Sequence, residues 1–210
     1  MDKFIIEGGN RLCGAVQTQS AKNSVLVLLA ASILTEEQVT IENVPHISDV
    51  LHMSEILQKL GADVCFADGN VTISSGNAAE RDLSSHLTRE LRSSVFMLGS
   101  VLTRFKHARI SYPGGCDIGL RPIDLHLFGL KKLGVKTEER DGYIVCNAEK
   151  LVGANIHLDF PSVGATENII LASVKAQGET VITNAAKEPE IRAHRQDTGG
   201  RQSGRSGNRS

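Results

Sequence analysis

The chain of 210 residues contains no tryptophan, and aromatic residues make up only 4% of it. A surface that stacks nucleic-acid bases needs aromatic rings, so this class of surface is not expected. The formal net charge is −1, which gives no overall field toward nucleic acid or an anionic membrane. The longest apolar run, residues 25–34, is about half the roughly 20 residues of a membrane helix, and MDKFIIEGG at the start contains no signal peptide. The sequence predicts a cytoplasmic globular protein without nucleic-acid or membrane partners.

Metal-ligand and disulfide patterns are also missing. The four cysteines, Cys13, Cys65, Cys116 and Cys146, form no CxxC pair, so we expect reduced thiols and read Cys13, Cys65 and Cys146 as packing residues. The seven histidines and 24 acidic residues never occur in an HExxH, HxH or EF-hand spacing. We therefore expect no metal site and no cofactor.

The near-zero charge is a cancellation between two parts of the chain. Residues 192–210 carry five arginines, one aspartate, four glycines and three serines, a formal charge of +4, which leaves −5 for residues 1–191. A segment with so little apolar surface cannot offset its ordering entropy, so we expect a disordered tail. A basic tail can bind nucleic acid or lipid, but a solvated or non-native end is the favoured interpretation.

The sequence repeats itself at intervals of about 70 residues. LQKLGADVCFADGNVTI (57–73) aligns without gaps to LKKLGVKTEERDGYIVC (130–146), with six of 17 positions identical. Each copy predicts the end of a helix at a glycine, a strand, an Asp-Gly turn and a second strand. The helix-type segment 22–34 resembles 92–104, and a third copy begins at Thr166, where VTIEN and TVITN match. Three such units predict an α/β domain with pseudo-threefold symmetry.

Residues 1–21 have no counterpart among the repeats. KFIIEG (3–8) and AVQTQ (15–19) are typical of two strands around a glycine-rich turn. An isolated pair of strands is marginal in water, so these strands need another sheet to join. We therefore divide the chain into residues 1–21, a three-repeat domain over 22–191, and the tail over 192–210.

Candidate chemistry lies at the junctions of the repeats. Lys22 and Asn23 precede one apolar helix, and Arg92 has the matching place before the next; a cation at a helix start favours binding of phosphate or carboxylate, although a solvated side chain is the alternative. Cys116 lies in a glycine-rich loop near Arg121, which could stabilise a thiolate, or the loop is simply a turn. PSVGATEN (161–168) could present hydroxyl and N–H groups to an anion, or Thr166 and Asn168 could cap a helix.

Five motifs in order carry a resemblance to a known family: AKN (21–23), LRSS (91–94), PGGCDIGLRPIDLH (113–126), DFPSVGATEN (159–168) and NAAKEPEI (184–191). Together they resemble UDP-N-acetylglucosamine 1-carboxyvinyltransferases, which belong to the enolpyruvyl transferases. The resemblance runs from residue 1 to residue 191. It implies one half of a two-domain inside-out α/β barrel in which each domain has three repeats. The implied reaction moves the enolpyruvyl group of phosphoenolpyruvate to the 3′-hydroxyl of UDP-N-acetylglucosamine and releases phosphate, at the start of peptidoglycan synthesis.

The resemblance also implies roles for individual residues. Cys116 matches the general acid, which forms an adduct with phosphoenolpyruvate and is alkylated by fosfomycin. The residues matched to phosphoenolpyruvate binding are Lys22, Asn23 and Arg121. Those matched to UDP-sugar binding are Arg92, Arg121, Pro122, Ile123, Asp124, Leu125, Ser162, Val163 and Gly164. Several cations suit two anionic substrates, and protonation of a methylene carbon needs a positioned acid.

The pattern of the family stops at Arg192, where the basic tail begins and a second domain is expected to follow. In the family the active site lies between the two domains, and residues 1–21 pair with the second one. We therefore expect little or no activity from this chain alone. The alternatives are a non-catalytic module that binds a UDP-sugar or a partner chain, and a 3-phosphoshikimate enolpyruvyl transferase, against which the cysteine loop argues. The oligomeric state is not predicted.

Overall fold

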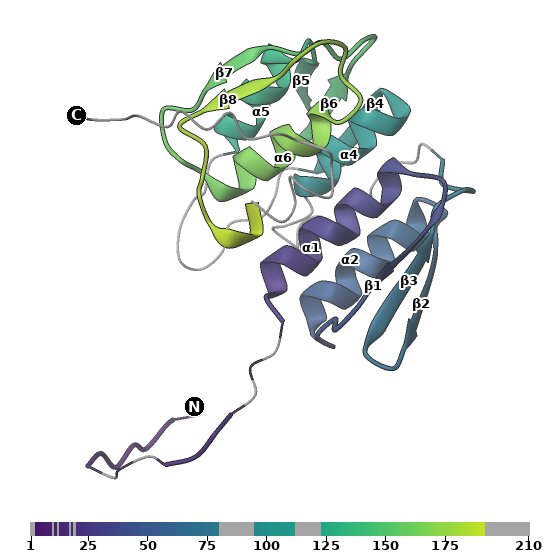
Figure 1. Ribbon diagram of the computed structural model, residues 1–210. Helices are drawn as coiled ribbons and strands as arrows, with labels where there is room; N and C mark the ends of the chain where they lie inside the picture. The colour runs from purple at the N-terminus through teal and green to yellow at the C-terminus, as the bar shows by residue number, and fades with distance from the viewer. Residues whose placement is uncertain are drawn as a thin grey trace, which may run out of the picture.

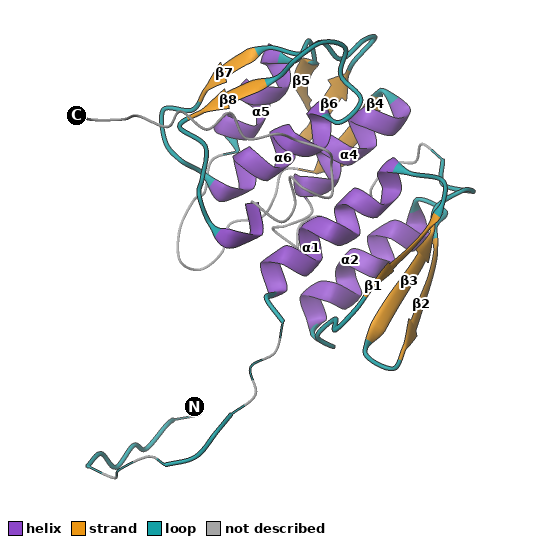
Figure 2. Ribbon diagram, in the orientation of Figure 1, coloured by secondary structure: helices purple, strands orange, loops and turns teal. Residues whose placement is uncertain are grey.

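The computed structural model describes residues 3–9, 11, 13–16, 18, 20–79, 95–111 and 123–191. Two units with the same order of elements follow one another along the chain (Figures 1 and 2). Each consists of a helix, a strand, a second helix and a β-hairpin. The first unit contains α1 (Lys22–Ala31), the short 3-10 helix η1 (Ser32–Leu34), β1 (Gln38–Ile41), α2 (Ser48–Lys59), β2 (Asp63–Ala67) and β3 (Asn70–Ser74). The second contains α4 (Val95–Phe105), β4 (His107–Ser111), α5 (Asp124–Lys132), β5 (Lys136–Arg140) and β6 (Tyr143–Asn147).

The two three-stranded sheets have the same topology. Their strand orders are β1-β3-β2 and β4-β6-β5, and all of the pairings are antiparallel. In each sheet the last strand of the unit lies in the middle, because it closes a hairpin and also accepts the first strand on its other edge. Matching topology in both units confirms the predicted repeat.

The glycines that end the second helix of each unit have the predicted conformation. Gly61 has a φ of 95° and Gly134 a φ of 94°. Ala62 donates its N–H to Leu57 O at 3.0 Å, and Val135 donates to Leu130 O at 3.1 Å. This six-residue hydrogen bond around a left-handed residue is the Schellman ending of a helix. The repeat therefore extends to the backbone hydrogen bonds that stop each helix.

The Asp-Gly pairs form the predicted hairpin turns. Asp68 and Gly69 have φ values of 49° and 75°, and Asp141 and Gly142 have values of 53° and 76°. Two successive positive φ angles are the requirement of a type I′ turn, which matches the twist of the strands that it joins.

The third unit contains β7 (Asn155–His157), α6 (Val163–Ser173) and β8 (Val181–Thr183). Strands β7 and β8 pair in parallel, unlike the hairpins of the other units. Asn43 follows β1 with a φ of 54°, and Asn184 follows β8 with a φ of 55°. The predicted match between VTIEN and TVITN is thus seen in both strands and in the turns after them.

Helix α6 packs closely against two neighbouring helices, and each contact has a glycine. A Cβ atom on Gly99 of α4 would lie 2.5 Å from the backbone oxygen of Asn168, and one on Gly129 of α5 would overlap the side chain of Ile169. Helix axes approach this closely only where one side chain is missing. Asn168 is fully buried, and its Oδ1 accepts the N–H of Gly99 at 2.8 Å.

Arg104, near the end of α4, joins the first two units. Its guanidinium donates to Ile33 O (2.8 Å), Thr35 O (3.0 Å), Ser75 Oγ (2.9 Å) and Ser75 O (2.7 Å). The planar group has five N–H donors and so satisfies several carbonyl groups that the end of η1 leaves without helical partners.

One apolar core runs through all three units. Helices α1, α4 and α6 are its centre, and each buries residues around most of its circumference, as expected for helices covered on all sides. Among the described residues, no helix combines the length and apolarity needed to cross a membrane.

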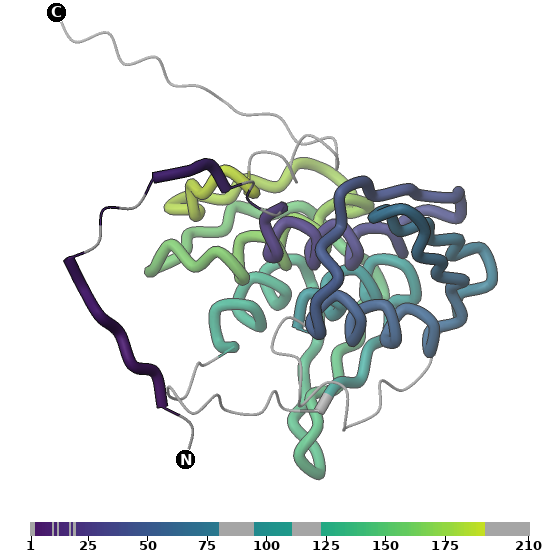
Figure 3. The backbone as a smooth tube through the Cα atoms, turned by 90° about the horizontal axis from the view of Figure 1, so that it is seen from below, coloured from purple at the N-terminus to yellow at the C-terminus, as the bar shows by residue number. Residues whose placement is uncertain are grey.

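The N-terminal strands that the sequence predicted are absent from the part of residues 1–21 that the structure describes. Residues 3–9 and 13–16 form no strand, and Phe4, Ile5 and Ile6 are 97%, 79% and 87% exposed. Figure 3 shows this segment lying away from the packed helices. The expected strands pair with a second domain, and the described part of the segment meets no sheet edge that could supply their hydrogen bonds, so this pairing stays a prediction.

The cysteine interpretation is confirmed only in part. Cys146 in β6 is fully buried, and burial raises the pKa of its thiol to about 12. Cys13 and Cys65 are exposed. Cys65 pairs with Thr72 in the sheet and shares its outward face, since the alternating neighbours Val71 and Ile73 take the buried positions.

A buried acid lies among the apolar residues of α6. Glu167 is 1% exposed, and its Oε1 has no hydrogen-bond partner among the residues that the structure describes. Burial, with a further contribution from the charges of Glu190 and Glu188, raises the pKa of this carboxyl from 4.5 to about 8. The folded chain therefore holds Glu167 protonated at neutral pH.

Replacement of Gly99 by alanine tests the close approach of α4 and α6. We expect Gly99→Ala to lower the free energy of unfolding by about 1–3 kcal/mol, because the added methyl group meets the backbone of Asn168. Gly8→Ala is the control, since a Cβ atom there meets nothing within 4 Å. Urea unfolding measures both, and equal midpoints would contradict the packing described.

Glu167 predicts a pH dependence of stability. Its folded pKa of about 8 exceeds the unfolded value of 4.5, so its contribution to the free energy of unfolding falls as pH rises through this range and is constant above it. Glu167→Gln removes the decline, and we expect the variant to be more stable than the wild type at about pH 8 by roughly 2–5 kcal/mol.

The readout for Glu167 is the difference between variant and wild type in urea unfolding at several pH values. Exposed Glu179→Gln is the matched control, which we expect to leave the pH profile unchanged. A constant difference between Glu167→Gln and the wild type from about pH 5 to 8 would show that Glu167 is ionised in the folded chain.

Candidate functional site

Three helices begin on the same side of the domain. Lys22 Nζ and Asp49 Oδ2 form an ion pair at 2.5 Å, which joins the first turns of α1 and α2. At the opposite end, Arg104 near the end of α4 binds the carbonyl groups of Ile33 and Thr35, which follow α1. The starts of α1 and α2 meet, and the ends of α1 and α4 meet. All three helices therefore run in the same direction (Figure 1).

Helices α5 and α6 follow this direction. Gly99 contacts Asn168, and further along both helices Thr103 Oγ1 donates to Leu171 O at 3.0 Å. His126, in the first turn of α5, lies against Gly164 in the first turn of α6. The starts of α1, α2, α4, α5 and α6 therefore lie at one end of the domain.

The clustered helix starts offer features that favour anions. Each start has N–H groups without helical acceptors and the positive end of a helix dipole. The first turns of α1, α4 and α6 contain no acidic residue, whereas those of α2 and α5 contain Asp49 and Asp124. This arrangement favours binding of phosphate or carboxylate groups.

Lys22 and Asn23, which the sequence placed just before a helix, form the first turn of α1, and both are exposed. The partner of Lys22, Asp49, belongs to the first turn of α2 and its side chain is 30% exposed. Asp49 was not predicted as a site residue, because no spacing in the sequence relates residues 22 and 49. In this structure the Lys22 ammonium is oriented by that carboxylate.

The start of α5 brings Ile123, Asp124 and Leu125 to the same end of the domain. Asp124 is exposed and Leu125 is half-buried. Ile123 is 5% exposed, so its side chain belongs to the core and a ligand would reach only its backbone.

The predicted anion loop is the turn that opens α6. Ser162 is the N-cap, and its Oγ accepts the N–H of Ala165 at 3.3 Å. Capping is thus performed by Ser162, whereas Thr166 and Asn168 lie inside the helix. The N–H groups of Val163 and Gly164 lie in the first turn of α6, where no carbonyl group of the helix can accept from them. They therefore remain available to a ligand.

His126 and Asn168 join this turn to the rest of the site. Asn168 Nδ2 lies 3.1 Å from His126 Nδ1. A Cβ atom on Gly164 would lie 3.2 Å from His126 Cε1 and 3.4 Å from Nε2. Burial lowers the pKa of His126 to about 4, so the ring is neutral at physiological pH. Asn168 was predicted only as a possible helix cap, and no role was predicted for His126.

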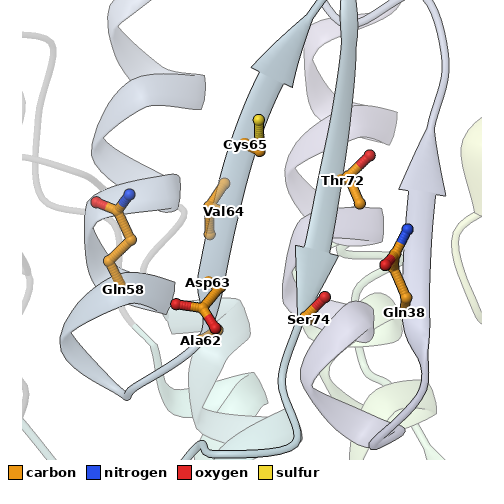
Figure 4. A pocket seen from close by; sticks show the side chains of 8 residues that line it. All are labelled: Gln38, Gln58, Ala62, Asp63, Val64, Cys65, Thr72 and Ser74. Atoms are coloured by element: carbon orange, nitrogen blue, oxygen red, sulfur yellow. The ribbon is translucent and has the colours of Figure 1, made fainter.

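Four predicted site residues, Arg92, Cys116, Arg121 and Pro122, lie outside the described residues. Two cavities lie on the first two sheets, and neither cavity contains a predicted site residue. One, of about 510 Å³, has Gln58 of α2 and Ala62, which follows that helix, beside Cys65 and Thr72 of the first sheet (Figure 4). It therefore lies away from the helix starts. Among the described residues, no group of three or more histidine, cysteine or acidic side chains could hold a metal ion.

Comparison with known proteins places the chain in a family. The sequence model of EPSP synthase (3-phosphoshikimate 1-carboxyvinyltransferase) matches residues 6–195. The chain is 53% identical over 191 residues to UDP-N-acetylglucosamine 1-carboxyvinyltransferase 2 of Caldanaerobacter subterraneus subsp. tengcongensis, covering 91% of this chain and 46% of that protein. It is 51% identical over 193 residues to UDP-N-acetylglucosamine 1-carboxyvinyltransferase 1 of Clostridium acetobutylicum, with the same coverage of both chains.

A solved structure supports the fold. The enolpyruvyl transferase NikO from Streptomyces tendae is similar with a TM-score of 0.79 and 25% identity, over 91% of this chain and 45% of that chain. The chain thus spans about half the length of the curated relatives and of the solved structure it matches. These findings confirm the predicted fold class and the resemblance carried by the five motifs. The chain belongs to the EPSP synthase family, the family of the enolpyruvyl transferases.

Proposed function

We propose that this chain is the N-terminal part of an enzyme that transfers the enolpyruvyl group of phosphoenolpyruvate to the 3′-hydroxyl of UDP-N-acetylglucosamine. Phosphate is released, and the product enters peptidoglycan synthesis. The observation that carries the proposal is the identity of 53% and 51% to relatives named for this activity, over 91% of the chain. The helix starts gathered at one end of the domain support it, because helix N-termini bind anions and both substrates are anions.

The start of α1 would bind phosphoenolpyruvate. The Lys22 ammonium can pair with its phosphate or carboxylate, and the N–H groups of the first turn can donate to the same oxygens. Asn23 adds an amide that can donate to an anionic oxygen or accept from a hydroxyl. Arg121 would add a bidentate cation from the segment before α5.

The starts of α5 and α6 would bind the UDP-sugar. The N–H groups of Val163 and Gly164, with the hydroxyl of Ser162, suit the oxygens of a diphosphate. Asp124 offers a carboxylate that can accept from an N–H of the base or a hydroxyl of a sugar. Arg92, Pro122, Ile123 and Leu125 would complete this site, as the resemblance implies.

Cys116 would act as the general acid. As the 3′-hydroxyl of the sugar gives its proton to a base of the second domain and its oxygen bonds to C2 of phosphoenolpyruvate, the thiol would donate its proton to the C3 methylene carbon. Transfer of one proton from C3 to a base would then break the bond between C2 and the phosphate oxygen, release phosphate and restore the double bond. A positioned acid of this kind typically contributes about 10²–10⁴-fold to the rate.

We expect the 210-residue chain by itself to have little or no transferase activity. It spans 46% of its curated relatives, and the resemblance places the active site between two domains. The measurement is phosphate release from phosphoenolpyruvate with and without UDP-N-acetylglucosamine. Release that depends on the sugar nucleotide and disappears in Cys116→Ala would contradict this expectation.

Binding of UDP-N-acetylglucosamine to the chain is a separate prediction. Isothermal titration should detect binding, and Asp124→Asn should weaken it about tenfold through loss of a charged acceptor. Glu55→Gln is the control, because Glu55 is an exposed acid on α2 outside the helix starts. Binding without turnover fits a half-site or the alternative of a non-catalytic UDP-sugar-binding module, whereas no binding contradicts the assignment of α5 and α6.

A further inference from the structure

Three residues from three helices form a chain of hydrogen bonds beneath the start of α6. The backbone N–H of Gly99 in α4 donates to Asn168 Oδ1 at 2.8 Å. On its other side, Asn168 Nδ2 lies 3.1 Å from Nδ1 of His126 in α5. Asn168 is fully buried, so its amide has no access to solvent as an alternative partner.

The position of each proton in this chain follows from donor and acceptor capacity. A backbone N–H can only donate, so the atom of Asn168 that faces Gly99 is its oxygen. The amide nitrogen consequently faces His126, and it too can only donate. His126 Nδ1 must therefore accept, which leaves the imidazole proton on Nε2.

The charge of the ring agrees with this assignment. Burial lowers the pKa of His126 to about 4. A protonated ring would direct an N–H from Nδ1 at the N–H₂ group of Asn168, and two donors repel. The neutral tautomer with its proton on Nε2 satisfies all three residues at once.

The Nε2 edge of the ring faces the turn that opens α6. A Cβ atom on Gly164 would lie 3.4 Å from Nε2 and 3.2 Å from Cε1, so glycine allows the ring to reach the turn. Within the described part of the chain, Nε2 has no hydrogen-bond acceptor. It is a donor beside the N–H groups of Val163 and Gly164.

We propose that Asn168 is a positioning residue that holds the His126 imidazole with its proton on Nε2, so that this N–H donates to an oxygen of the nucleotide sugar at the Ser162–Gly164 turn. The identity of the ligand rests on the proposed function, whereas the position of the proton rests on the hydrogen bonds alone.

Nitrogen NMR of the chain labelled at histidine tests the position of the proton. The chain has seven histidines, and loss of one signal in His126→Phe assigns the ring. We expect an unprotonated Nδ1, a protonated Nε2 and no titration between about pH 5 and 8. A proton on Nδ1, or a charged ring at neutral pH, overturns the proposal without any variant of Asn168.

Asn168→Asp is the matched variant. It keeps an oxygen that accepts the N–H of Gly99 and replaces only the donor that faces His126. The new carboxylate should draw the proton to Nδ1 and raise the pKa of His126 into the range that NMR can follow. An unchanged tautomer in a folded Asn168→Asp chain contradicts the positioning role.

Titration with UDP-N-acetylglucosamine tests the ligand. At about pH 8.5 the variant should bind about tenfold more weakly than the wild type, because Nε2 has lost its proton. The loss should diminish as pH falls and the ring regains a second proton, whereas a purely structural defect would give a loss that does not vary with pH. Absence of binding to the wild type, with Nε2 protonated, overturns the proposed function and the ligand assignment but supports the positioning role.

Discussion

Helix α6 packs so closely between α4 and α5 that glycine is needed on both neighbours. Gly99 gives α4 room against the backbone of Asn168, and Gly129 gives α5 room against Ile169. The missing side chains allow backbone and amide groups to meet, and Asn168 accepts the N–H of Gly99 in a fully buried setting. A buried amide left without its partners would lower the free energy of unfolding by about 1–3 kcal/mol. Close packing and hydrogen bonding therefore favour the same placement of α6 between α4 and α5.

The alignment of the helices is what creates a site. Since α1, α2, α4, α5 and α6 run in one direction, their unsatisfied N–H groups and positive dipole ends add at one end of the domain. Lys22 and the turn at Ser162 lie at this end, although they are 140 residues apart in the sequence. The Lys22 ammonium pairs with the carboxylate of Asp49. An anionic substrate would take the place of this carboxylate as the partner of Lys22.

Much of the fold could be predicted from local sequence signals. Gly61 and Gly134 end helices, and the pairs at Asp68 and Asp141 form hairpin turns, because these steps depend on conformational preferences of one or two residues. The strands predicted within residues 3–8 and 15–19 depend instead on a partner outside their own segment. A strand is stable only with a partner, and no sheet edge in this chain meets the described part of that segment.

The sequence by itself determined the three-unit pattern, the turns and helix ends, the family, and which segments carry the predicted site residues. Each of these is encoded over a few neighbouring residues. Only the tertiary structure decided that Lys22 pairs with Asp49, that Ile123 faces the core, and that Asn168 links Gly99 to His126. These contacts join residues between 27 and 69 positions apart, and they exist because close packing sets the angle and depth at which the helices meet.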